Sequence, residues 1–145
     1  PPPPPLFFFI QTTAYSMLRS LVGSEMCIRD RFETLQIIKA SNSVFVPVQP
    51  SPLDLMATLP FLQLAKEERK KPLIILNRVM PRARLTDAMI LRLRYAGAKI
   101  ARSRISSKVL FAETFSVGRG VIDISVTSDA AKEIINAGNE IIRNS

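Results

Sequence analysis

The sequence lacks several residues and motifs on which common catalytic sites depend. It contains no histidine and one cysteine in 145 residues. The absence of histidine excludes histidine-based metal sites and Ser-His or Cys-His catalytic pairs, and a single cysteine excludes an internal disulfide framework. None of the five glycines belongs to a G-x-x-x-x-G-K-[S/T] phosphate-binding loop. By inventory alone, these absences remove most hydrolase chemistry.

The overall composition is typical of one α/β domain. The chain is 47% hydrophobic and 22% charged, and its length is sufficient for a substantial core.

A strand, a turn and the start of a helix follow one another between positions 44 and 55. The first five residues of this segment are apolar and mostly β-branched, as in a strand that is covered on both faces of a parallel sheet. Pro47 cannot donate to a ladder, which indicates that the strand ends there. Ser51 can cap a helix in which Pro52 takes the first position and Asp54 faces the positive helix end. The pattern predicts a strand that leads directly into a capped helix.

Apolar spacing predicts the remaining elements. Strands are expected at 73–76 and 98–102, and a loop is expected to begin at Ile105. Ser128 is expected to cap the last helix. The expected core stripes of the three main helices are Leu55, Leu59, Leu62 and Ala65; Leu85, Met89, Leu93 and Ala96; and Ala131, Ile134, Ile135, Gly138, Ile141 and Ile142.

The segment ASNSVFVPVQPSPLDL at 40–55 resembles the ParA/MinD group of deviant P-loop ATPases, and within it the ParA-type partition proteins. Later phrases agree with this resemblance in the same order: LNRV at 76–79, RARL at 82–85, ISSKVLFAET at 105–114 and GVID at 120–123. The resemblance covers about residues 32–145. It implies the C-terminal half of a three-layer α/β fold with a mostly parallel sheet and helices on both faces.

The resemblance also implies that the phosphate-binding loop and the magnesium-site aspartate belong upstream of Phe32. ATP and Mg²⁺ are the cofactors of the parent family, and we expect neither to bind tightly to this chain. We therefore expect no catalytic residue and no metal ligand in this chain, and we expect the chain to be inactive as an ATP hydrolase as written. Half a sheet would expose a strand edge, which predicts a tendency to aggregate.

Residues 1–31 differ from the rest of the chain. Five prolines and the run LFFFI precede the phrase GSEMCIRDR, which resembles translated sequencing-adapter read-through. A polyproline ligand or a signal peptide is a poorer interpretation, because no basic residues precede the apolar run and the run is short. We expect a non-native, disordered leader over 1–31, followed by the ATPase-like half-domain over 32–145.

The resemblance implies an adenine-binding edge. Asn77 would contact the base from the carboxyl edge of the sheet, beside Arg78, and the loop with Ile105, Ser106 and Ser107 would close over the base. An amide can donate to and accept from a base edge at once, and open α/β sheets bind ligands at that edge. The alternative is that Asn77 ends a strand and organises a turn.

Positive charge is concentrated between Arg78 and Lys108. This segment has nine basic residues and one aspartate, a net charge of +8 that equals the net charge of the whole chain. Such a surface is typical of non-sequence-specific phosphate contacts. The resemblance implies duplex DNA contacts by Arg82, Arg84 and Lys108, and Arg94 is expected on the same exposed helix face as Arg84. The alternative is a basic face that only solubilises the protein; single-strand binding is disfavoured because aromatic residues are not interleaved.

The function that the resemblance implies is an ATP-driven partition switch for chromosomes or plasmids. An ATP-dependent homodimer would bind non-specific duplex DNA in the cytoplasm, at the nucleoid, and a ParB-like partner would stimulate hydrolysis. No membrane partner is expected, because Glu133 and Glu140 balance Lys132 and Arg143 on the last helix. Two other interpretations stay open: a non-enzymatic basic nucleic-acid-binding module, and a MinD-like membrane-associated ATPase.

Overall fold

The structure is a computed structural model that describes residues 7–9, 25–81 and 84–145. Along the chain the elements are β1 (Phe7–Phe9), α2 (Glu25–Ala40), β2 (Ser43–Val48), α3 (Pro52–Glu67), β3 (Leu73–Val79), α4 (Arg84–Tyr95), β4 (Lys99–Ser106), α5 (Val109–Ser116), α6 (Val121–Ile124) and α7 (Asp129–Arg143).

The described strands form one four-stranded sheet in the order β1-β2-β3-β4. All three pairings are parallel. Each crossover between β2, β3 and β4 contains one helix, as a parallel sheet requires. The prediction of an α/β fold with a parallel sheet is confirmed.

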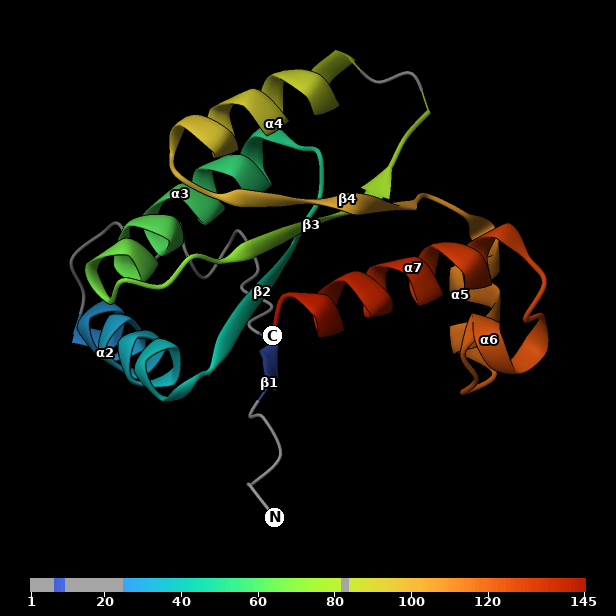
Figure 1. The fold of residues 1–145 in the computed structure, drawn as a ribbon, viewed down its shortest axis with the longest axis horizontal. Coiled ribbons are helices and arrows are strands. Elements are labelled where there is room, and N and C mark those ends of the chain that lie inside the picture. The colour runs from blue at the N-terminus through green and yellow to red at the C-terminus, as the bar shows by residue number, and fades with distance from the viewer. Residues whose placement is uncertain (1–6, 10–24, 82–83) are drawn as a thin grey trace.

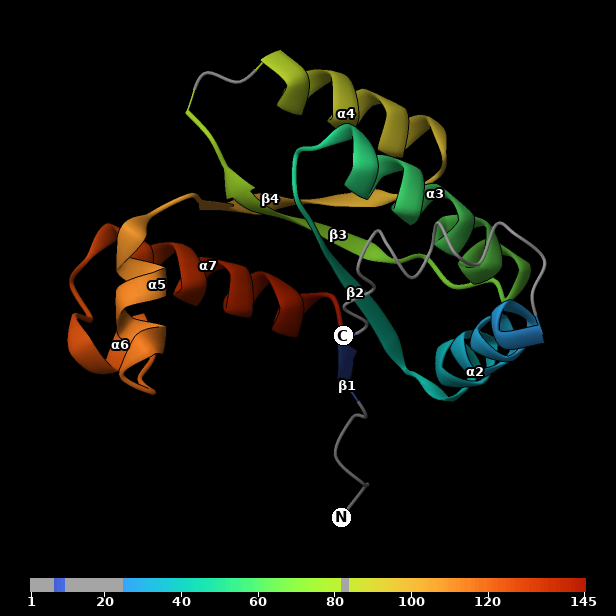
Figure 2. The same cartoon turned by 180° about the vertical axis from the view of Figure 1, so that it is seen from behind.

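Helices cover both faces of the sheet. In Figures 1 and 2, α3 and α4 lie on one side of the sheet and α7 lies on the other. The larger core joins the first side to the sheet and includes Leu62, Leu76, Met89 and Leu93, all of them buried. A smaller core around Phe45 and the partly buried Ile141 lies on the α7 side. The predicted three-layer arrangement is therefore confirmed.

The helix ends follow the local sequence signals. The Ser51 hydroxyl accepts a hydrogen bond from the Asp54 N–H at 3.0 Å, and Pro52 occupies the first turn of α3. The Ser128 hydroxyl accepts from the Ala131 N–H at 3.2 Å, which caps α7 as predicted. Gly97 has φ of 88° directly after α4, a left-handed conformation that glycine adopts without steric cost.

Four residues of the predicted core stripes are on the surface. Leu59 and Ile135 are each 37% exposed, Leu85 is 45% exposed and Ile142 is 72% exposed. In α4 the buried positions are Thr86, Met89, Ile90 and Leu93, so the buried face is centred one residue further along than the spacing predicted. The buried face of α3 is likewise centred on Thr58, Phe61 and Ala65, which leaves Leu59 at its margin.

Two strand boundaries were also wrong. β3 continues through Asn77 to Val79, and β4 continues to Ser106, so Ile105 and Ser106 belong to a strand rather than to a loop. The physical reason is tertiary, because Ile105 packs against the smaller core and Ser106 is hydrogen-bonded to α7.

The segment 1–31 contributes β1 and the first residues of α2. Its non-native origin stays a prediction, as does the division of the chain at residue 32. No helix within the described ranges is long and apolar enough to cross a membrane.

Candidate functional site

Two irregularities in the β3–β4 ladder shape the carboxyl edge of the sheet. Ile74 pairs with Ile100 and Leu76 with Arg104, so β4 has two extra residues in this interval. The pairing then passes from Leu76 to Val79 on β3 and from Arg104 to Ser106 on β4, which leaves one extra residue on β3. Bulges of this kind bend a strand and re-aim its side chains, and they are frequent next to binding sites.

Two carboxylates of α7 satisfy backbone groups along β4. Glu140 accepts hydrogen bonds from the N–H groups of Arg102 and Ser103, both at 2.8 Å. Glu133 accepts from the Ser106 N–H at 2.9 Å and from the Ser106 hydroxyl at 2.8 Å. Because β4 is an edge strand of the described sheet, these contacts occupy donors that another strand would otherwise take.

The pKa of both carboxyl groups is shifted in the same direction. Burial raises the pKa of Glu133, but hydrogen bonds from Lys108 and Ser106 outweigh this effect and hold the pKa below its ordinary value. Burial likewise raises the pKa of Glu140, and the hydrogen bonds from Arg102 and Ser103 outweigh it. Both groups are therefore ionised when β4 is in place at neutral pH.

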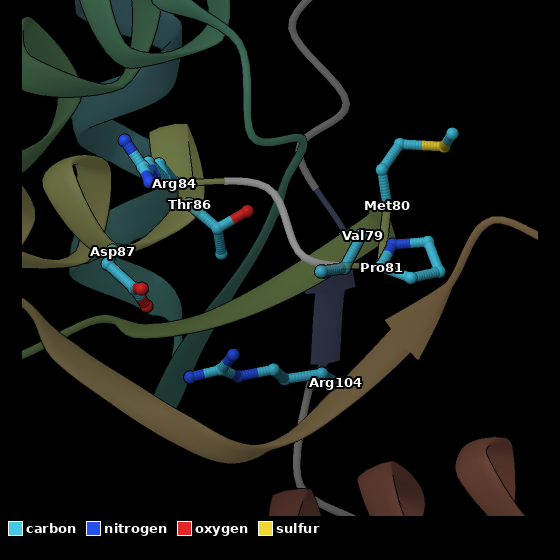
Figure 3. Close-up of a pocket in the computed structure, with 7 residues that line it drawn as sticks. All are labelled: Val79, Met80, Pro81, Arg84, Thr86, Asp87 and Arg104. Atoms are coloured by element: carbon cyan, nitrogen blue, oxygen red, sulfur yellow. The ribbon is translucent and has the colours of Figure 1, made fainter.

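A cavity of about 310 Å³ lies between the end of β3, the start of α4 and β4. Figure 3 shows Arg84, Thr86 and Asp87 projecting from the first turn of α4, while Arg104 reaches across from β4. The remaining lining residues are Val79, Met80 and Pro81. This position, beyond the carboxyl ends of parallel strands, is where open α/β sheets bind ligands.

The charges around this cavity are predominantly positive. Arg84 and Arg104 are exposed, and neither side chain has a hydrogen bond or ion pair to another described residue. Among the described residues that line the cavity, Asp87 is the only acidic one. Arg84 occupies the first turn of α4, where the helix dipole disfavours a cation, whereas Arg92 and Arg94 occupy the favourable last turn. The cavity is therefore suited to an anion.

Several of the predicted adenine-contacting residues already have contacts within the protein at the carboxyl edge of the sheet. The Asn77 side-chain oxygen accepts a hydrogen bond from the Arg78 N–H at 2.9 Å, and Arg78 has φ of 53°. Asn77 thus organises the local backbone, which was the alternative to a contact with adenine. Its amide nitrogen has no partner among the described residues. Ile105 packs into the smaller core and Ser106 is bound to Glu133.

The fifth predicted residue, Ser107, is exposed, and its N–H donates to the Val79 carbonyl at 3.0 Å. Of the three residues that were expected to close over a base, Ser107 is exposed, whereas Ile105 and Ser106 are partly buried.

The predicted DNA-contacting residues also separate into groups. Arg84 and Arg94 are exposed on α4, as expected. Lys108 instead donates to Glu133 at 2.8 Å in an ion pair that is half-buried. Arg82 lies outside the described residues. The structure therefore leaves Arg84 and Arg94 available on the surface and gives Lys108 a structural contact.

Sequence reasoning missed Arg104 and Thr86 as cavity residues. Arg104 belongs to the basic segment, but only the irregular β3–β4 register places it opposite Leu76. Thr86 shares the buried face of α4 with Met89 and Leu93. A polar residue at this helical spacing is a signal from which Thr86 could have been found. In the described part of the chain, no group of three or more acidic, histidine or cysteine side chains is arranged to hold a metal ion.

Comparison with known proteins gives one distant relationship. No protein-family model matches the chain. The chain is 27% identical over 115 residues to a protein of Halothiobacillus neapolitanus named maintenance of carboxysome distribution protein A, an alignment that covers 75% of this chain. The chain spans about half, 53%, of the length of that curated relative. The similarity supports a ParA/MinD-like relationship, in agreement with the sequence motifs.

Proposed function

We propose that residues 32–145 are the C-terminal half of a ParA-like positioning ATPase. The observation that carries this proposal is the 27% identity, over 115 residues, to a protein named for the maintenance of carboxysome distribution. The parallel sheet with helices on both faces supports it. The catalytic residues of the parent would then belong to the other half.

The nucleotide site of the parent would only partly belong to this chain. The free amide nitrogen of Asn77, at the carboxyl edge of β3, can donate to an acceptor on the adenine ring. The chain offers no glycine-rich loop with a lysine for the phosphates of ATP, and its described residues offer no acidic cluster for Mg²⁺. We therefore place phosphate and Mg²⁺ binding in the parent outside this chain.

The basic surface around α4 would contact non-specific duplex DNA. Arg84 and Arg94 are exposed on this helix and Arg104 is exposed beside it. In the parent, ATP would favour a homodimer that presents two such surfaces to DNA at the nucleoid in the cytoplasm, and a ParB-like partner would stimulate hydrolysis and release. We omit Lys108 from this surface because it pairs with Glu133.

The DNA contact can be tested with the chain as it stands. Fluorescence anisotropy of a labelled duplex of arbitrary sequence, measured between about 50 and 200 mM salt, gives the affinity and its salt dependence. We expect binding that weakens steeply with salt, and we expect Arg84→Gln to reduce the magnitude of the slope by about one. The matched control is Arg119→Gln, which removes an exposed arginine from the segment between α5 and α6 and should change the slope little if that segment lies outside the contact.

The relationship to an ATPase needs a separate test. Sequencing the gene across the codons for residues 31 and 32 should reveal an in-frame phosphate-binding loop upstream. The protein that contains this loop should bind duplex DNA more tightly with ATP than without it. If instead the polyproline segment is continuous with residue 32 in authentic transcript, or if DNA binding does not respond to ATP, the ATPase proposal fails and a non-enzymatic basic module explains the surface.

A further inference from the structure

The side chain of Thr86 is unusual in the core of α4. Thr86 is 3% exposed, and its hydroxyl oxygen is buried without a hydrogen-bond partner in the structure. Among the buried side-chain polar atoms of the described residues, this is the one without a partner. A buried hydroxyl without a partner destabilises a fold and is rare in native proteins, so an orphan of this kind calls for an explanation.

The surroundings of Thr86 indicate what its partner would be. Thr86 lies in the first turn of α4 and lines the cavity between α4, β3 and β4. In Figure 3 its side chain projects toward the space that Val79 and Pro81 border, with Arg84 on one side and Arg104 below. The first-turn N–H groups of a helix lack intrahelical acceptors and favour negative charge. A hydroxyl donor, helix N–H groups and two guanidinium groups form a donor set for an oxyanion.

Arg84 supports the same conclusion independently of Thr86. A cation in the first turn of a helix is unfavourable, and Arg84 has no compensating ion pair with a described residue. Local rules of this kind are broken mainly where function requires it. An anion bound between Arg84 and Arg104 would remove the unfavourable interaction.

We propose that this cavity seats one phosphate group of a duplex DNA backbone, with Thr86 donating its hydroxyl and Arg84 and Arg104 supplying the charge. This inference rests on the proposed function, because it assigns to one cavity a contact of the basic α4 surface. A volume of about 310 Å³ is at the low end for a ligand pocket. It suits a single phosphate group that enters from the surface.

A substitution at Asp87 distinguishes a phosphate site from a cation site. Its carboxylate lines the cavity and opposes an anion, so Asp87→Asn should tighten binding of a phosphate by about two- to threefold at low salt. A site for a cation would respond in the opposite direction. The same substitution therefore tests the sign of the bound charge.

The main experiment compares Thr86→Val with Thr86→Ser in duplex binding. Thr86→Val keeps the shape and removes the hydroxyl, so the full chain should bind the labelled duplex about tenfold more weakly, while Thr86→Ser should bind nearly as well as the parent chain. Arg104→Gln should reduce the salt slope by about one, and Arg119→Gln serves as the control. Because Thr86→Val removes an orphan polar group, its thermal midpoint should equal or exceed that of the parent chain. A merely structural threonine would give lower stability and unchanged DNA affinity.

A second measurement uses inorganic phosphate, followed through the amide NMR signal of residue 86. We expect a saturable shift in the parent chain and in Thr86→Ser, and none in Thr86→Val. If Thr86→Val binds duplex normally while Arg84→Gln weakens binding, the proposal that the cavity binds a backbone phosphate is refuted, but the DNA-binding surface on α4 stands. If the chain binds no duplex and phosphate alone shifts the signal, the assignment to a DNA backbone is refuted and the cavity binds a free phosphate group.

Discussion

Replacement of Glu140 by alanine should destabilise the fold through the bulge in β4. The Glu140 carboxylate accepts hydrogen bonds from the N–H groups of Arg102 and Ser103, both at 2.8 Å. These N–H groups lie in the interval where β4 has two more residues than β3, so the ladder does not pair them regularly. In Glu140→Ala both donors must turn to water or to a different partner.

The expected cost follows from the two hydrogen bonds. A bond to a charged acceptor contributes about 1.5–3 kcal/mol, and partial exposure of this site favours the lower limit. We expect Glu140→Ala to lower the free energy of unfolding at pH 7 by about 3 kcal/mol, twice the lower limit for one bond and a large part of the ~5–15 kcal/mol typical of a domain. Glu140→Gln keeps one acceptor oxygen and should cost about half as much. Urea titration followed by circular dichroism measures these values, with Glu113→Ala as the control because Glu113 is exposed and its carboxylate has no described partner.

The pH dependence gives a second signature of the same contact. The pKa of Glu140 lies below its ordinary value in the folded chain, because hydrogen bonds from Arg102 and Ser103 outweigh the effect of burial. A lowered pKa contributes stability above the unfolded-state pKa, about 4.3, and this contribution is lost as the pH falls through the folded-state value. The difference between the parent chain and Glu140→Ala should therefore shrink below about pH 4. A difference under ~0.5 kcal/mol at pH 7, or one that does not change from pH 7 to 3, would refute the reasoning.

Three further predictions concern the core, a helix cap and the DNA surface. Leu93→Ala should lower the free energy of unfolding by about 2–5 kcal/mol because Leu93 is fully buried, whereas Leu91→Ala, at a position that is 54% exposed, should change it by under ~0.5 kcal/mol. Ser51→Ala should cost about 1 kcal/mol by removing the cap of α3; an unchanged urea midpoint would contradict the cap. Lys108→Gln should leave the salt dependence of duplex binding unchanged because Lys108 pairs with Glu133, and a slope reduced by about one would return Lys108 to the DNA surface.

Features encoded within a few residues were predictable from the sequence. The cap of α3 needs only Ser51, Pro52 and Asp54, and the structure shows it as predicted. The buried strands β2 and β3 were found because β-branched runs between turn residues have few alternative structures.

Features that depend on contacts between distant segments were not predictable. The length of β4 depends on Glu133 and Glu140, which are more than twenty residues away in the chain. The cavity depends on the β3–β4 register, which no local pattern in the sequence specifies. Lys108 has the sequence context of a surface cation, and only the position of α7 shows that it is paired. Charge was therefore predictable as a property of the segment but not residue by residue.

The bulge in β4 connects the stabilising contacts of α7 with the cavity on the opposite face of the sheet. Leu76 belongs to the core on the α4 side, and its partner Arg104 faces the same side because paired residues of neighbouring strands share a face. Two extra residues precede Arg104 on β4, and Glu140 holds them from the α7 side. Loss of Glu140 should therefore allow β4 to shift its register and displace Arg104 from the cavity. We expect Glu140→Ala, under conditions where it remains folded, to reduce the phosphate-induced shift of the residue 86 amide signal, whereas Glu113→Ala should not. An unchanged phosphate response in folded Glu140→Ala would show that the register of β4 is held by the packing of Ile100 in the larger core and not by Glu140.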